Sequence, residues 1–72
     1  TGVTLPLLGW GSRGQTVRLL QAALAGLGYG ALAADGIFGD NTAGAVKRFQ
    51  AAEALAADGI VGRDTWHKLL GI

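Results

Sequence analysis

The sequence predicts an all-α fold, a small three-helix bundle with two Asp-Gly-Ile-x-Gly turn loops. Apolar residues recur at spacings of three and four in separate stretches, as they do on one face of a helix. No stretch alternates apolar and polar residues over more than a few positions, which a half-buried strand would require. Glycine and aspartate stand between the periodic stretches, where turns are expected.

The length of 72 residues allows one domain, and we expect residues 1–72 to form it, with 1–11 as an irregular lead. A domain of this size buries only about 60% of the surface that its unfolded chain exposes, so the core must be economical. Half of the residues are apolar, but the aromatic ones are two Trp, two Phe and one Tyr. The core is therefore expected to consist mainly of Leu, Val, Ile and Ala.

The first helix is predicted over about residues 15–27. Its apolar stripe is formed by Val17, Leu20, Leu24 and Leu27. Ser12 or Thr16 can cap its start, and Gly28 stands where a left-handed residue commonly ends a helix.

The second and third helices are predicted over about residues 41–52 and 63–70. The inward side chains of these helices are Ala45, Val46 and Phe49 in the second and Trp66, Leu69 and Leu70 in the third. Gly44 weakens the second helix by roughly 1 kcal/mol relative to Ala, and a close approach of another backbone would explain its presence. None of the three helices would be stable alone, so we expect them to close one core together.

A repeated phrase occupies the predicted turns. Residues 35–42 read DGIFGDNT and residues 58–65 read DGIVGRDT, with five identities in eight positions. In each copy the Asp carboxylate can accept hydrogen bonds from backbone N–H groups two or more residues on and so close a turn. The Gly that follows can adopt a positive φ without the strain that a Cβ would bring.

Ile37 and Ile60 are single apolar residues between the glycines of these phrases. We expect each to pin its loop to the core by one buried side chain, worth roughly 1.5–3 kcal/mol. Thr42 and Thr65 fall in the first turns of the following helices. The N-cap of the second helix is expected at Asp40 or Asn41, and that of the third at Asp64 or Gly62.

Composition excludes several classes of function. The absence of cysteine excludes a disulfide framework and a thiolate metal site. A net charge of +1 is too near neutral for the phosphate neutralisation of a nucleic-acid partner. No apolar run approaches the ~20 residues that span a bilayer. The start of the chain lacks the pattern of a signal peptide, so we expect no membrane partner and an export signal outside this chain.

Three stretches together resemble the peptidoglycan-binding domain found beside cell-wall hydrolases. They are GSRGQTVRLLQAALAGLGY (11–29), DGIFGDNTAGAVKRFQ (35–50) and DGIVGRDTWHKLL (58–70). The resemblance implies a non-catalytic three-helix module of bacterial or phage enzymes, which holds amidases, muramidases, glucosaminidases or peptidases on peptidoglycan. Such domains commonly have Gly where Ala54 stands and Pro near Ala56, so the second helix is expected to end differently or to continue further.

The residues that could support catalysis can all be interpreted as structural. His67 has no Cys or second His with which to bind a metal, and its position indicates a solvated helix face. Asp35 and Asp58 could form the carboxylate pair of a glycosidase, but an Asp before Gly in a turn favours a carboxylate bonded to backbone. The phrases also lack the closing Glu of an EF-hand. We therefore expect no enzyme, no cofactor and no metal.

Binding is the remaining class of function, and the resemblance implies peptidoglycan as the partner. Its sugar hydroxyls, amides and carboxylates require a site that joins an aromatic platform to hydrogen-bonding groups and a cation. The candidate ligand-binding residues are Tyr29, Phe38, Arg48 and Gln50.

Each candidate could instead serve packing or solvation. The Tyr29 ring can pack against Leu27 or Val46, and the alignment of Phe38 with Val61 favours packing in both loops. The polar candidates and the two tryptophans are also open to more than one interpretation. Gln50 can bond a neighbouring loop's backbone, Arg48 can join Lys47 on a solvated helix face, Trp66 is expected in the core, and Trp10 can cover the core or form an exposed platform.

Two functions follow from these patterns. The first is a monomeric, extracellular or cell-wall-associated module that binds peptidoglycan reversibly and raises the local concentration of an attached hydrolase. The second is a protein–protein docking or structural module of a larger enzyme, without glycan contact.

Overall fold

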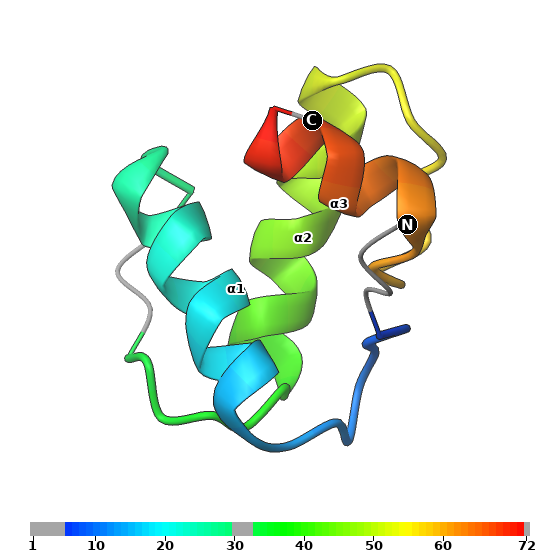
Figure 1. Ribbon diagram of the computed structural model, residues 1–72. Coiled ribbons are helices and arrows are strands. Elements are labelled where there is room, and N and C mark those ends of the chain that lie inside the picture. The colour runs from blue at the N-terminus through cyan, green and yellow to red at the C-terminus, as the bar shows by residue number, and fades with distance from the viewer. Residues whose placement is uncertain (1–5, 30–32, 72) are drawn as a thin grey trace, which may run out of the picture.

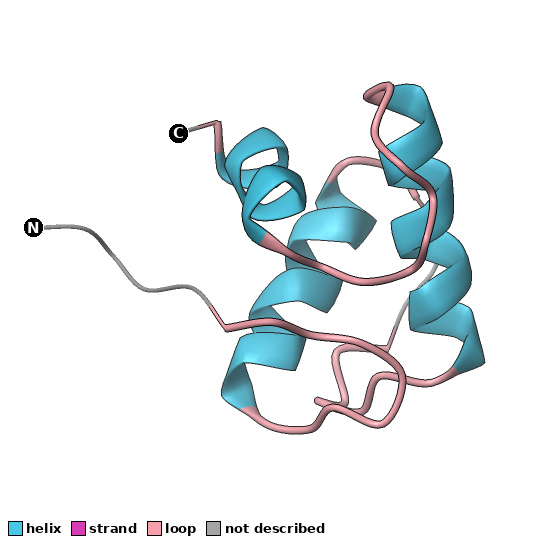
Figure 2. Ribbon diagram, turned by 90° about the vertical axis from the view of Figure 1, so that its right-hand side faces the viewer, coloured by secondary structure: helices cyan, strands magenta, loops and turns pink. Residues whose placement is uncertain are grey.

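The computed structural model describes residues 6–29 and 33–71. Over these residues it contains helices joined by loops and no strand, as Figures 1 and 2 show. The helices are α1 (Gln15–Gly26), α2 (Asp40–Ala52) and α3 (Arg63–Leu70). The predicted all-α, three-helix fold is confirmed, and the observed bounds lie within one residue of the expected ranges.

The three helices enclose one hydrophobic core, with α2 between α1 and α3 (Figure 1). Its fully buried members from the helices are Val17, Leu20, Leu24, Ala45, Val46 and Trp66. Trp66 lies in the core as predicted, and its indole N–H donates to the Pro6 carbonyl at 2.8 Å. Leu27 does not continue the stripe, because α1 ends before it and its side chain is exposed. No described helix is long and apolar enough for a membrane span, the longest having 13 residues.

The loop residue that fills the core is one position later than predicted. Ile37 and Ile60 are 48% and 46% exposed, whereas Phe38 and Val61 are 1% and 0% exposed. The N–H and C=O groups of each Ile are both held by polar side chains of the turn. Because successive residues of an extended chain point to opposite sides, the next side chain turns into the core.

The helices begin at glycines and not at the predicted polar caps. The N-cap residues are Gly14, Gly39 and Gly62, and none of the three helices has a side-chain cap. Gly62 is one of the two caps expected for α3, but Asp40 lies inside α2. Ser12 instead accepts a hydrogen bond from the Gly9 N–H at 3.1 Å.

The segment before α1 runs along both repeated loops (Figure 1). Leu8 forms an isolated antiparallel bridge with Val61, with N–O distances of 3.2 and 2.8 Å. The Gly11 N–H donates to the Phe38 carbonyl, and the Phe38 N–H donates to the Ser12 carbonyl, both at 2.9 Å. The described part of the predicted irregular lead therefore ties the two loops together; residues 1–5 lie outside the described residues.

The helices α1 and α2 both end before a residue with left-handed backbone. In α1 this residue is Gly28, with a φ of 87°, as predicted. In α2 it is Ala54, with a φ of 58°, and the next N–H, that of Leu55, donates to the Gln50 carbonyl at 2.8 Å. A residue with a Cβ in this conformation costs roughly 1–2 kcal/mol. The helix thus stops at Ala52 although the glycine of the family pattern is missing.

Candidate functional site

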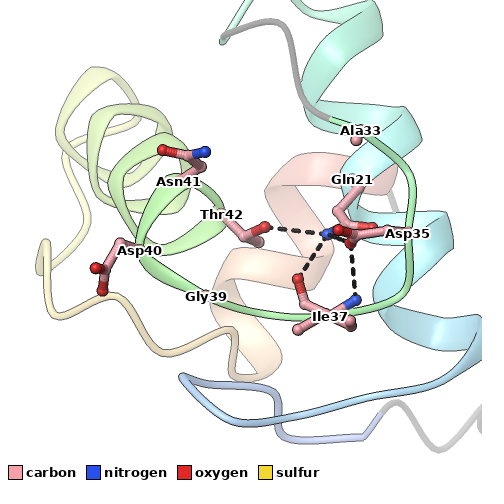
Figure 3. Close-up of a pocket in the computed structure, with 8 residues that line it drawn as sticks. All are labelled: Gln21, Ala33, Asp35, Ile37, Gly39, Asp40, Asn41 and Thr42. Carbon is pink, nitrogen blue, oxygen red and sulfur yellow. Dashed lines mark hydrogen bonds between the residues drawn. The ribbon is translucent and has the colours of Figure 1, made fainter.

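Two buried glutamines hold the repeated loops in place. Gln21 of α1 is 1% exposed and reaches the loop that leads into α2, as Figure 3 shows. Three acceptors lie within hydrogen-bond distance of its Nε2, namely Asp35 Oδ1 at 3.1 Å, the Ile37 carbonyl at 2.9 Å and Thr42 Oγ1 at 3.1 Å. Its Oε1 accepts the Gly36 N–H at 3.0 Å.

Gln50 of α2 makes the same set of contacts in the second loop. Its Nε2 lies 3.1 Å from Asp58 Oδ1, 2.9 Å from the Ile60 carbonyl and 3.1 Å from Thr65 Oγ1, and its Oε1 accepts the Gly59 N–H at 3.0 Å. All four distances equal those around Gln21. We call these two arrangements the Gln-held turns: the first comprises Gln21, residues 35–37 and Thr42, and the second comprises Gln50, residues 58–60 and Thr65.

The two aspartates close the turns, as the sequence predicted. Asp35 Oδ1 accepts the Ile37 N–H and Asp58 Oδ1 accepts the Ile60 N–H, each at 2.9 Å. These backbone hydrogen bonds, and then those from the glutamines, hold the pKa of both carboxyls below the ordinary value of 3.8. A general acid at neutral pH needs a raised pKa. The pKa shifts therefore favour a structural role over a glycosidase pair.

Gly36 and Gly59 leave room for a cationic side chain over each turn. Both have a φ of 76°. A Cβ at Gly36 would lie 3.2 Å from the Arg18 side chain, and one at Gly59 would lie 3.1 Å from Lys47 Cε. Both positions thus favour glycine for backbone conformation, and at Gly36 a Cβ would also lie 3.1 Å from the Gly14 carbonyl oxygen.

The repeat extends into the helices, which sequence reasoning missed. Residues 17–23 read VRLLQAA and residues 46–52 read VKRFQAA, so the basic residues and the glutamines occupy matching positions. The match is hidden because 13 residues separate Gln21 from Asp35 while 7 separate Gln50 from Asp58. A search that allowed this difference in length would have found the whole unit.

The structure does not bring the four predicted contact residues into one site. Phe38 and Gln50 are each 1% exposed; Phe38 packs in the core, and the Gln50 amide is engaged in hydrogen bonds with its own turn. Tyr29 and Arg48 do lie together, because Arg48 Nη2 donates to the Tyr29 carbonyl at 3.4 Å. The half-buried Tyr29 packs against the hydrophobic core, to which the expected partner Val46 belongs, and its ring meets Phe49 edge-on with centroids 5.5 Å apart.

A shallow hollow opens beside each Gln-held turn. The first has a volume of about 360 Å³ and is drawn in Figure 3; it is lined by Gln21, Ala33, Asp35, Ile37, Gly39, Asp40, Asn41 and Thr42. The second has a volume of about 490 Å³ and is lined by the repeat counterparts of all eight, together with Leu7 and Leu55. The chemical difference is that Asp40 and Asn41 of the first hollow are replaced by Arg63 and Asp64 in the second.

A larger hollow of about 620 Å³ lies between the segment before α1, helix α2 and the second Gln-held turn. Trp10 and Leu7 in this hollow are each 73% exposed. The Trp10 indole N–H donates to Asp40 Oδ1 at 3.0 Å. We call this hollow the Trp10 groove; its further lining residues include Lys47, Asp58 and Ile60.

The described residues offer no metal centre. No group of three or more His, Cys, Asp or Glu side chains in residues 6–29 and 33–71 is arranged to hold a metal ion. His67 is exposed on α3. The side chains that line the hollows include carboxylates, amides and cations, which can form hydrogen bonds with a ligand.

Comparison with known proteins identifies the fold and its family. The model of the peptidoglycan binding domain family matches residues 13–69. The chain belongs to the peptidoglycan-binding domain family. This confirms the resemblance carried by the repeated phrases, and domains of this family are found in cell-wall hydrolases.

The relatives of this peptidoglycan-binding domain include much longer enzymes. The domain is 56% identical over 61 residues to the zinc D-Ala-D-Ala carboxypeptidase of Streptomyces albus G, covering 82% of this chain and 24% of that protein. It is 49% identical over 63 residues to an N-acetylmuramoyl-L-alanine amidase of Bacillus licheniformis, covering 79% of this chain and 18% of that one. The crystal structure of the SleB N-terminal domain superposes with a TM-score of 0.90 at 30% identity, covering 97% of this chain and 96% of that chain.

Proposed function

We propose that this domain is a non-catalytic module that anchors an attached cell-wall hydrolase to bacterial peptidoglycan. The observation that carries the proposal is the match of the family model to residues 13–69. In the two similar enzymes, the part that aligns with this chain makes up 24% and 18% of the protein. The Gln-held turns support a module without catalytic activity, because the carboxylates of Asp35 and Asp58 are engaged in hydrogen bonds with backbone N–H groups.

Anchoring works through effective concentration. A domain that binds the polymer reversibly keeps an attached enzyme near its substrate, even when each contact is weak. The hollows of this domain are shallow and open, which suits transient contact with a long polymer. We propose that residues 1–72 act as one monomeric unit at the bacterial cell wall, outside the cell.

Tyr29 and Arg48 remain proposed contacts, whereas the buried Phe38 and Gln50 do not. Arg48 is exposed at the end of α2 and carries a planar guanidinium that can bind a carboxylate with two parallel hydrogen bonds. The neighbouring Tyr29 is half-buried and brings a hydroxyl group. This pair suits the carboxylates of the stem peptide.

Sedimentation with purified sacculi tests the proposal. We expect the 72-residue domain to pellet with sacculi at low salt and to cause no loss of turbidity. A domain that stays in the supernatant would contradict anchoring. Capture by a hydrolase in the absence of sacculi would then favour a protein–protein docking or structural module.

A further inference from the structure

We infer that the Trp10 groove is a saccharide site, in which the indole ring carries the apolar face of an N-acetylated hexosamine of the glycan strand. The inference rests on the proposed function and specifies the part of peptidoglycan that this groove contacts. Trp10 lies outside the span of the family match, residues 13–69.

Trp10 is not a member of the hydrophobic core that the described residues form. Its side chain is 73% exposed. The ring is nevertheless oriented, because its N–H donates to Asp40 Oδ1 at 3.0 Å across 30 positions of the chain. An exposed aromatic ring that is held in place by its polar edge presents its faces to a ligand at a reduced cost in conformational entropy.

The surroundings of the ring fit an N-acetylated sugar. A pyranose ring has a face of C–H groups, which the negative face of an aromatic ring attracts, and hydroxyl groups around its edge. Leu7 and Ile60 extend the apolar surface, being 73% and 46% exposed, and can receive the methyl of an acetamido group. Asp58 and Lys47 supply an acceptor and a donor on the same groove.

The charges of the groove favour a neutral sugar over a phosphate polymer. Asp40 and Asp58 together outweigh Lys47, so the lining carries a net negative charge. A groove that stacks nucleic-acid bases needs positive charge for the phosphates. Asp58 receives its hydrogen bonds from Ile60 and Gln50 on Oδ1, which leaves Oδ2 as an acceptor for sugar hydroxyls.

The first test uses tryptophan fluorescence of the whole chain, titrated with peptide-free glycan strands. Trp66 is fully buried, so changes in quenching by iodide report on Trp10. We expect glycan strands to shift the emission to shorter wavelength and to protect Trp10 from iodide. Stem peptides without sugar are the second arm. A response to stem peptides alone, or no response to glycan strands, would overturn the inference.

The second test compares variants in sedimentation with sacculi. We expect Trp10→Ala to weaken binding about tenfold, which corresponds to the loss of one aromatic contact, and Trp10→Phe to weaken it less. Leu19→Ala is the matched control, because Leu19 is 55% exposed on α1 outside the groove. The thermal melt of Trp10→Ala should remain close to that of the native chain.

The two proposals can fail separately. If the native chain pellets and Trp10→Ala pellets equally well, the saccharide site is refuted while anchoring stands. If the native chain does not pellet, anchoring fails, and the fluorescence titration still decides whether the groove binds glycan.

Discussion

The two Gln-held turns share their internal hydrogen bonds but differ in what surrounds them. The first is tied to the segment before α1 through Gly11, Ser12 and Gly14, and it sends Phe38 into the core. The second is tied to the same segment through Leu8 and sends the smaller Val61 inward. The same turn geometry therefore occurs twice, with different backbone partners in the segment before α1 and different side chains in the core.

Comparing the two turns distinguishes residues that hold the fold from residues that are exposed on the surface. The repeated Gln, Asp and Thr side chains are occupied with holding the turns, whereas the unrepeated Trp10, Asp40 and Asn41 are exposed. Trp10 has no counterpart, because the segment before α1 occurs once, and Asp40 and Asn41 differ in chemistry from their counterparts Arg63 and Asp64. We infer that the unrepeated Trp10 sets the ligand preference of its groove, which the repeated Lys47, Asp58 and Ile60 complete.

The largest expected effect comes from the loop side chains that fill the core. We expect Phe38→Ala to lower the free energy of unfolding by about 3–5 kcal/mol and Val61→Ala by roughly 2 kcal/mol, because the larger side chain leaves the larger cavity. Ile37→Ala and Ile60→Ala are the controls and should cost less than about 1 kcal/mol each. Urea denaturation measures all four, and a larger loss for the Ile variants would contradict the assignment of Phe38 and Val61.

The glutamines test whether the two turns are equivalent. Gln21→Met and Gln50→Met keep the volume but remove the hydrogen bonds, so each should cost roughly 2–3 kcal/mol. The two losses should agree within about 0.5 kcal/mol, because the contacts have the same lengths. Gln15→Met, on the exposed side of α1, is the matched control. A difference above about 1 kcal/mol between the two turns would show that their surroundings, and not the shared bonds, set their stability.

The left-handed residue after the helix is Gly28 for α1 and Ala54 for α2. Exchanging Gly and Ala at these two positions should change the stability of the domain in opposite directions. Ala54→Gly should stabilise the domain by roughly 0.5–1 kcal/mol, and Gly28→Ala should destabilise it by roughly 1–2 kcal/mol, because both positions have positive φ. Thermal denaturation of both variants measures the effect. A loss of stability in Ala54→Gly would show that the left-handed conformation at this position carries no strain.

Gly44→Ala is the complementary change inside α2. The close approach expected at this glycine is not found among residues 6–29 and 33–71, none of which, apart from the adjoining backbone of α2, has an atom within 4 Å of a Cβ placed there. The substitution should therefore stabilise the domain by roughly 0.5–1 kcal/mol through helix propensity alone. A loss of stability in Gly44→Ala would contradict this prediction, because it would show that a side chain at this position clashes with another part of the chain.

The smallest expected effect is a dependence on pH. The folded-state pKa values of Asp35 and Asp58 lie below their unfolded values, so their contribution is present above the unfolded pKa and is lost as pH falls through the folded pKa, below about pH 4. Asp35→Asn and Asp58→Asn keep the Oδ1 acceptor and should flatten this dependence. Added salt should reduce it more for Asp35, because Arg18 contributes there alone. Denaturation between about pH 2 and 6 measures the slope, and an unchanged slope in both variants would assign it to other carboxyls.

The fold was predictable from sequence because its determinants are local. The helical stripes and the Asp-Gly pairs act within a few residues, and the turn role of Asp35 and Asp58 follows from that spacing. The alignment of Phe38 with Val61 favoured packing of Phe38, but the exposure of Ile37 was not predictable in this way. It depends on Gln21, which bonds the Ile37 carbonyl from 16 positions away.

The candidate site was less predictable, because residues distant in sequence form its surfaces. Tyr29 and Arg48 do lie together, but nothing in the pattern distinguishes them from Gln50, which the second turn engages. The Trp10 groove joins the segment before α1 to α2 and the second turn. The burial of Trp66 was predicted from sequence, but only the packing of these elements shows that Trp10 is exposed.

The most direct test of the division between scaffold and surface is a map of amide NMR shifts for the whole chain titrated with soluble muropeptides. We expect the largest shifts at the Trp10 indole N–H and in the residues around Lys47 and Arg48, with the Gly36 amide unmoved. Largest shifts at the Gly36 and Thr65 amides, with Trp10 unmoved, would show that the repeated turns themselves bind the ligand.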